Sequence, residues 1–388
     1  MSNIQEMLEL NGGSFDKAEA MARQLIKDGR NDVWLDLSLL QHAQGKTLEC
    51  RASNAEYKQF FPDCPRLAFG EAWWKLYDGD LQGGLEHIEH GRSIGTLGDQ
   101  NLKRLKGRLW NGEDDLTNKT VLLVGEGGMG DQIMGVRSAG HLSKWNCTVI
   151  VACSKELASL FRRCPGVTAT VDLEAANSVS HDYYVPMMSS YRLMSEDRGT
   201  LWPGPYVKPC DKHSVWSRVI VSEEDRMPNI GCGGGRLSHD HPNALKVGIR
   251  WKGNPRFEHE QLRVFPPELM WNAVYQDELK VYSLQKDCGE KPPEWVTDLE
   301  PLLGDWEQTA AAIDALDLVI TSCTGVAHLS AAMGKETWVV VPAMPYYPWA
   351  RPGSKSDWYP SVRLFRQERY GEWKKPFEEI FNALKERT

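Results

Sequence analysis

The feature of this chain that most constrains its fold is an alternation of short β-branched runs with helical stretches, which occurs twice. Between residues 119 and 216 the runs KTVLLV, TVIVAC, VTATV and YYVPMM alternate with amphipathic segments such as SKELASLFRRC. From residue 246 the pattern starts again, with the runs KVGIRW, LKVYSLQ, LVITSC, TWVVVP and VRLF. Apolar runs separated by helices predict parallel strands joined by crossover helices. The polar, glycine-rich residues 229–243 between the two blocks predict a linker.

Two such blocks predict two Rossmann-like domains that face each other across a cleft, where the ligands of open α/β sheets bind. We expect the first domain at residues 118–228 and the second, which ends in an amphipathic helix, at residues 244–388. In front of them, residues 14–45 and 65–95 each contain two amphipathic stretches around a glycine turn. Their period is near that of tetratricopeptide (TPR) units and predicts a small all-α, TPR-like domain over residues 1–110, although an ordinary helical bundle also fits.

Composition narrows the classes of function. The chain has 41% hydrophobic and 25% charged residues, no apolar run near the roughly 18 residues of a membrane span, and no signal-peptide core, so we expect a soluble cytoplasmic protein. Its net charge of -8 makes nucleic acid a weak but not excluded acceptor. The nine cysteines show no C-x-x-C pair and no His at ligand spacing, which indicates reduced thiols and no metal site.

The first stretch that suggests chemistry is VLLVGEGGMGDQIMGVR at residues 121–137, where an apolar run enters a helix, expected to open near Asp131, through a loop with four glycines. Glycines at such a turn let the backbone approach a ligand, and the helix N-terminus is polarised positive. The loop fits G-x-G-x-x-G only loosely and lacks the acidic residue of dinucleotide sites. Asp131 has two interpretations here: a helix N-cap, or a general base for an acceptor hydroxyl.

The second stretch, residues 247–270, ends a strand in Trp251, Lys252, Gly253 and Asn254 before a charged loop. Positive charge is concentrated at this point of the sequence, on Lys252, Arg256 and Arg263. The loop is either an ordinary solvated loop or a site that stabilises a departing diphosphate.

The third stretch, DLVITSCTGVAHLSAAMG at residues 317–334, leads from a buried strand through Thr324 and Gly325 into a helix rich in small residues. The start of this helix is a potential anion site without fixed positive charge, with Thr324 as its cap. His328 lies one turn inside and is either structural or within reach of the same phosphate. The small residues also allow close packing of the helix on the sheet, whatever the function.

These three stretches, in this order and after an N-terminal helical region, resemble glycosyltransferases of the lipopolysaccharide heptosyltransferase type. The resemblance is to the branch that carries N-terminal TPR repeats. The resemblance spans roughly residues 65–367 and is carried by LWNGEDDLTNKTVLLVGEGGMGDQIMGVR, VGIRWKGNP, YSLQ, DWEQTAAAIDALDLVITSCTGVAHLSAAMG and WYPSVRLFRQ. It implies an inverting, metal-independent transferase of the GT-B fold without a cofactor. The acceptor would lie mainly on the first α/β domain and the nucleotide sugar on the second.

The resemblance also assigns roles to residues. Asp131 matches the proposed base, and a departure stands at Cys323, where the family usually has Asp, which puts donor use in question. The donor side comprises Trp251, Lys252, Asn254, Arg263, Gln285, Thr324, Gly325 and His328, and the acceptor-side loop comprises Gly128, Gly130 and Gln132.

Two other classes remain open on the sequence. A non-catalytic adaptor with a degenerate transferase module is supported by Cys323, and a dinucleotide-dependent oxidoreductase by the glycine loop. The missing ribose-binding acid and the second anion site near Thr324 count against the oxidoreductase. Nothing in the residues chooses among a glycan, a protein side chain, a lipid-linked sugar and a hydroxymethylated DNA base as acceptor. The helical leader suits either a protein partner or self-association.

Overall fold

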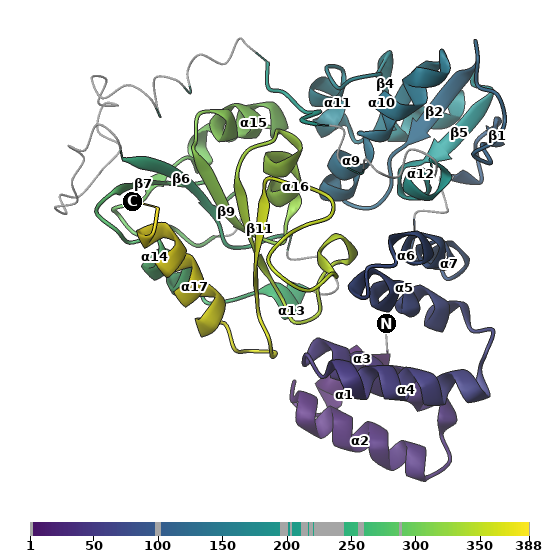
Figure 1. The fold of residues 1–388 in the computed structure, drawn as a ribbon, viewed down its shortest axis with the longest axis vertical. Coiled ribbons are helices and arrows are strands. Elements are labelled where there is room, and N and C mark those ends of the chain that lie inside the picture. Colours follow the sequence, from purple (N-terminus) through teal and green to yellow (C-terminus); the bar gives the residue numbers. More distant parts are fainter. Residues whose placement is uncertain are drawn as a thin grey trace.

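The computed structural model describes residues 3–97, 102–194, 201, 204–210, 216, 220, 244–254, 260–286 and 289–387. In chain order these residues form a helical region and two parallel β-sheets with helices packed on them (Figure 1). The α/β architecture with an all-α region in front is therefore confirmed. The predicted linker at residues 229–243 lies outside the described residues, as does Arg256.

Turn glycines and a capping side chain set the helix ends of the N-terminal region. Gly29, Gly45 and Gly79 follow helices with φ of 91°, 79° and 87°, a left-handed conformation that glycine adopts without strain. Asp80 begins the next helix by accepting the Gly83 N–H at 2.9 Å. Both predicted hairpins are helical; that they are TPR units stays a prediction. The helices are α1 (Asn3–Leu10), α2 (Phe15–Lys27), α3 (Trp34–Ala43), α4 (Thr47–Phe60), α5 (Pro65–Tyr77), α6 (Leu81–Ile88) and α7 (His90–Ser93).

The first sheet is parallel, with the strand order β1-β5-β2-β3-β4. In the central strand β2, Val121 to Val124 are fully buried, as a continuous apolar run requires. β1 pairs with β5, so this sheet begins within residues 1–110, which the sequence had assigned to the helical domain. The strands are β1 (Arg108–Leu109), β2 (Thr120–Val124), β3 (Thr148–Cys153), β4 (Ala169–Asp172) and β5 (Tyr183–Pro186), and the helices are α9 (Met129–Gly135), α10 (Ser138–Leu142), α11 (Lys155–Phe161) and α12 (Met187–Leu193).

The second sheet is also parallel, with the order β11-β10-β9-β6-β7-β8. Its two strands β9 and β10 are buried along their whole length. The strands are β6 (Leu245–Arg250), β7 (Leu279–Ser283), β8 (Thr297–Asp298), β9 (Leu318–Ser322), β10 (Thr337–Val341) and β11 (Val362–Arg366). The helices are α13 (Glu260–Arg263), α14 (Pro267–Ala273), α15 (Trp306–Asp314), α16 (Gly325–Ala332) and α17 (Lys374–Lys385).

One hydrophobic cluster joins the three parts of the chain. It includes Leu85 of the helical region, Met188 of the first α/β domain, and Tyr347 and Trp349 of the second. Helices α9 and α16, which belong to different sheets, pack directly against each other (Figure 1). The first turns of the helices that follow β2 and β9 therefore meet at this junction. No helix in the described ranges is both long and apolar enough to cross a bilayer.

Candidate active site

The glycine-rich loop presents Asp131 from the first turn of α9. The chain leaves β2 at Val124 and turns through Gly127, whose φ of 62° favours glycine. The helix begins at Met129 with Gly128 as its N-cap, so the prediction that it opens near Asp131 is corrected by two residues. Asp131 itself is not the N-cap; it is the third residue of the helix, and from this first turn its Oδ2 accepts the Gly128 N–H at 2.7 Å.

The other carboxylate oxygen of Asp131 contacts the second α/β domain. The Tyr346 hydroxyl donates a hydrogen bond to Asp131 Oδ1 at 2.5 Å. Burial raises the pKa of Asp131 above its usual value, while the hydrogen bonds from Tyr346 and from the Gly128 N–H lower it. The half-buried carboxyl thus lies between two domains with an upward-shifted pKa, which suits a group that takes up a proton.

The first turns of α9 and α16 touch through two glycines, Gly130 and Gly325. A Cβ added to Gly130 would lie 3.2 Å from Gly325 Cα and 3.0 Å from His328 Cδ2. A Cβ added to Gly325 would lie 2.9 Å from the Trp306 ring. Only residues without side chains allow this approach. The structure therefore brings together the first and third predicted stretches, and at this point the two domains are in van der Waals contact across the predicted cleft.

The start of α16 is neutral. Thr324 is the N-cap by position, but its hydroxyl lies 3.3 Å from Thr321 Oγ1, so the prediction of a side-chain cap is not what the structure shows. His328 is buried, with Nδ1 3.1 Å from the Tyr359 hydroxyl and its ring stacked on Trp349 at 5.2 Å. Burial, and then the charge of Arg137, lower the pKa of His328 to about 3. The imidazole is therefore uncharged at neutral pH.

Cys323 stands between Arg263 and Trp349. Arg263 donates from Nη1 to the Cys323 carbonyl oxygen, and Trp349 Nε1 donates to Cys323 Sγ at 3.2 Å. Burial raises the pKa of the Cys323 thiol, so a neutral sulfur occupies the position of the expected carboxylate. Arg263 also donates from Nε to Glu260 Oε2 at 2.5 Å. The structure thus places Arg263 beside the start of α16, and Glu260 is a partner that the sequence analysis missed.

The ends of β6 and β7 are tied together by Gln285. Its Oε1 accepts the Lys252 N–H at 2.9 Å and the Trp251 N–H at 3.2 Å. Trp251 Nε1 and Lys252 Nζ each lie 3.1 Å from a Glu290 carboxylate oxygen, which offsets the positive charge that we predicted here. Asn254 is exposed at the end of this segment. These residues form one connected group, with Gln285 holding its backbone.

Gln132 has a different place from the one expected. Its side chain is buried and bonds Ser154, with Nε2 donating to Ser154 Oγ at 2.9 Å and Oε1 accepting the Ser154 N–H at 2.8 Å. It therefore links α9 to the start of α11 inside the first domain. The assignment of Gly128 and Gly130 to the acceptor side stays a prediction. Across the described ranges, no group of three His, Cys, Asp or Glu side chains is arranged to hold a metal ion.

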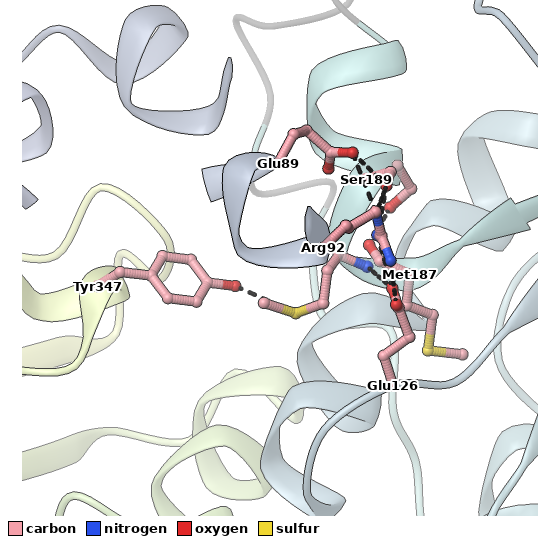
Figure 2. A network of polar contacts seen from close by, with 8 residues as sticks. Glu89, Arg92, Glu126, Met187, Ser189 and Tyr347 are labelled. Carbon is pink, nitrogen blue, oxygen red and sulfur yellow. Dashed lines mark hydrogen bonds and ion pairs between the residues drawn. The ribbon is translucent and has the colours of Figure 1, made fainter. Parts of the chain in front are cut away.

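A buried ion pair joins the glycine-rich loop to the helical region. Glu126, with 1% of its side chain exposed, accepts from Arg92 Nη1 at 2.5 Å and from Arg92 Nη2 at 3.1 Å. Figure 2 shows this pair together with Glu89 and Ser189, both of which also bond Arg92. The sequence analysis missed Glu126 and Arg92, which are 34 residues apart, because no local pattern links them.

No protein-family model matches this chain. The curated Protein FlbA of Caulobacter vibrioides is 24% identical over 396 aligned residues. The alignment covers 96% of this chain, but the chain spans only 63% of the length of that relative.

Solved glycosyltransferases are similar in structure. The family 9 glycosyl transferase from Veillonella parvula has a TM-score of 0.49 at 10% identity, covering 71% of this chain and 98% of that one. The ADP-heptose lps heptosyltransferase II of E. coli has a TM-score of 0.45 at 12% identity, covering 69% and 100%. The iron-containing dodecameric glycosyltransferase TibC from enterotoxigenic E. coli has a TM-score of 0.42 at 12% identity, covering 71% and 78%.

Proposed function

We propose that this chain is a glycosyltransferase that moves a sugar from a nucleotide-activated donor to an acceptor hydroxyl. The observation that carries the proposal is the meeting of two unlike turns. The first holds the carboxylate of Asp131, and the second holds the start of α16 with Arg263 beside it. A proton acceptor next to a helix N-terminus suits a reaction in which a hydroxyl loses a proton and a phosphate leaves.

The proposed reaction is a single displacement with inversion, without a metal. Asp131 takes the proton of the acceptor hydroxyl, whose oxygen attacks the anomeric carbon. The bond from that carbon to the diphosphate oxygen breaks, and the nucleoside diphosphate leaves with the electron pair. Its added negative charge faces the first turn of α16 and Arg263. Because Tyr346 donates to Asp131 Oδ1, an acceptor hydroxyl that uses this oxygen has to displace the phenol or share the oxygen with it.

The test is nucleotide release by the Asp131→Asn variant. Asn keeps an oxygen for the Gly128 N–H but cannot act as the base, so we expect turnover to fall by about 10²- to 10⁴-fold while ADP still binds. Incubation with a panel of nucleotide sugars, followed by mass spectrometry, measures release and identifies the sugar and base. ADP-heptose is the first donor to try, because TibC has been solved in complex with it.

Asp80→Asn is the matched control, because Asp80 also accepts a backbone N–H in the first turn of a helix but lies at the start of α6. Its turnover should equal that of the wild type. An Asp131→Asn variant that binds ADP and retains full turnover would remove Asp131 as the base.

The neutral thiol of Cys323 favours a second candidate, a non-catalytic adaptor. The two are separated by thermal unfolding with ADP, UDP or NAD, because a ligand that binds only the folded state raises the midpoint. We expect stabilisation by a nucleoside diphosphate. An adaptor would respond to none of the three, and a response to NAD alone would favour an oxidoreductase.

A further inference from the structure

Helices α5 to α7 contact both loops that hold Asp131, although they belong to the helical region. On one side, Arg92 of α7 forms a two-pronged ion pair with Glu126 in the glycine-rich loop (Figure 2). On the other side, Trp73 of α5 donates from Nε1 to the Pro345 carbonyl oxygen at 2.8 Å. Pro345 directly precedes Tyr346, the residue that donates to Asp131.

The shape of the glycine-rich loop depends on the first contact. Glu126 is turned inward, where its Oε2 also accepts the Met188 N–H of α12 at 3.0 Å. A buried carboxylate is costly unless a cation and further donors satisfy it. Arg92 supplies that cation. Gly127, which follows Glu126 in the chain, has a φ of 62°, and this conformation directs the Gly128 N–H toward Asp131. The loop is thus held in place from the helical region.

Arg92 is itself fixed in orientation. Its Nε lies 3.1 Å from Glu89 Oε2 and 3.2 Å from Ser189 Oγ, and the Ser189 hydroxyl donates to Glu89 at 3.0 Å. Such a guanidinium, bound on several sides, presents a rigid fork to Glu126. A flexible surface pair would not set the position of a loop in this way.

The second contact fixes the loop that carries Tyr346. The ring of Trp73 lies edge-on to Tyr347 at 6.3 Å, and Tyr347 reaches Met188 Sδ with its hydroxyl at 3.6 Å. The helical region, the first domain and the second domain therefore converge on this loop. A shift of α5 would move the phenol of Tyr346 relative to the carboxylate of Asp131.

We propose that Arg92 and Trp73 are positioning residues of the transferase: from the helical region they set the two loops that orient Asp131. The inference rests on the proposed function and adds to it that two contacts from helices α7 and α5 position the proposed base. Loss of either contact would lower turnover while leaving the group around Gln285 unchanged, because that group lies on other loops.

The experiment compares Arg92→Met, Arg92→Lys and Trp73→Phe in the full chain. Arg51→Met is the matched control, because Arg51 forms the same two-pronged pair with Asp78 inside the helical region, at 3.0 and 2.7 Å. Donor KM and kcat are measured by nucleotide release from the active donor. Hydrogen exchange of residues 121–136 reports the loop directly and needs no turnover.

We expect Arg92→Met to lower kcat by about 10- to 100-fold with an unchanged donor KM, the effect of a misplaced catalytic group. Arg92→Lys should recover part of kcat, since lysine supplies the charge without the fork. Trp73→Phe should lose about 3- to 10-fold, the factor that one neutral hydrogen bond is worth. Exchange in residues 121–136 should rise in Arg92→Met and stay at the wild-type level in Arg51→Met.

The inference is overturned if Arg92→Met and Trp73→Phe change kcat and loop exchange no more than Arg51→Met does. If Arg92→Met raises hydrogen exchange throughout the chain, the kcat and donor KM of Trp73→Phe become the test of the positioning role. If the wild type releases nucleotide from no donor, the transferase proposal fails and the exchange data alone judge the positioning: selective loosening of residues 121–136 supports it, and wild-type exchange overturns it.

Discussion

The two strand-to-helix turns at the junction have a similar backbone arrangement but different chemistry. Both leave a buried parallel strand, use glycine at the start of a helix, and meet through Gly130 and Gly325. The turn after β2 carries two carboxylates, Asp131 and Glu126, each satisfied by a donor from another domain. The turn after β9 carries a thiol, a hydroxyl and an imidazole, none of them charged at neutral pH.

The difference separates two tasks. A carboxylate with a raised pKa can take up a proton, whereas a neutral helix start without a carboxylate does not repel an anion. An aspartate in place of Cys323 would put a buried negative charge beside Trp349 Nε1, at the start of α16. A neutral Cys323 adds no repulsion to the proposed phosphate site, where the backbone N–H groups and Arg263, itself paired with Glu260, would supply the attraction.

The largest effect is expected when acid protonates His328, because the turn after β9 is neutral only while this imidazole is uncharged. Its pKa is about 3 in the fold against 6.5 for the free side chain, so the unfolded chain binds the proton more strongly. The stability from this residue is complete above pH 6.5 and is lost as the pH falls toward 3, at up to about 1.4 kcal/mol per pH unit.

His328→Asn should remove that part of the slope of unfolding free energy against pH, measured by chemical denaturation between pH 4 and 7. His42, which burial gives a pKa of about 4, contributes its own slope in the helical region, so His42→Asn is the matched control and should flatten the curve similarly without affecting ADP binding. An unchanged slope in His328→Asn would mean that His328 has the same pKa in the folded and unfolded chain, so that the second turn would become positively charged already below pH 6.5.

The next effect tests the contact between the turns. In Gly325→Ala the added methyl would meet the Trp306 ring at 2.9 Å, so overpacking should cost about 1 to 3 kcal/mol and weaken the stabilisation by ADP. In the control Gly128→Ala the methyl would lie 3.6 Å from Asp131 Oδ2, an ordinary contact, at a φ of -83° that alanine adopts. Thermal unfolding with and without ADP measures both. Equal midpoints in the two variants would show that the contact is not tight.

The sequence predicted the strands, the helices and both turns because these depend on local patterns. Continuous apolar runs mark β2 and β9, and glycines mark the turns that follow them. What it missed are partners distant in the chain: Tyr346 for Asp131, 215 residues away, and Glu290 for Lys252, 38 residues away. Such pairs form only when distant parts of the chain come together in the fold, and for this reason the sequence did not show that Glu290 offsets the positive charge of Lys252.

The smallest effect concerns Tyr346, through which the second domain acts on the carboxylate of the first. The phenol hydrogen bond lowers the pKa of Asp131 against the upward effect of burial, so Tyr346→Phe should raise that pKa further. Because the base works only when deprotonated, the acidic limb of kcat/KM should move to higher pH, with little change at alkaline pH where Asp131 is ionised in both proteins.

Other ionisable groups near Asp131 are Glu126, Tyr191, Tyr347, Tyr359 and Cys323, and the variant leaves all of them in place. Tyr347→Phe is the matched control, because Tyr347 adjoins Tyr346 but directs its hydroxyl to Met188 Sδ, and its acidic limb should stay near that of the wild type. If both variants shift the limb alike, the effect comes from the loop as a whole. A limb that moves only in Tyr346→Phe would assign the tuning of Asp131 to a single hydrogen bond between the domains.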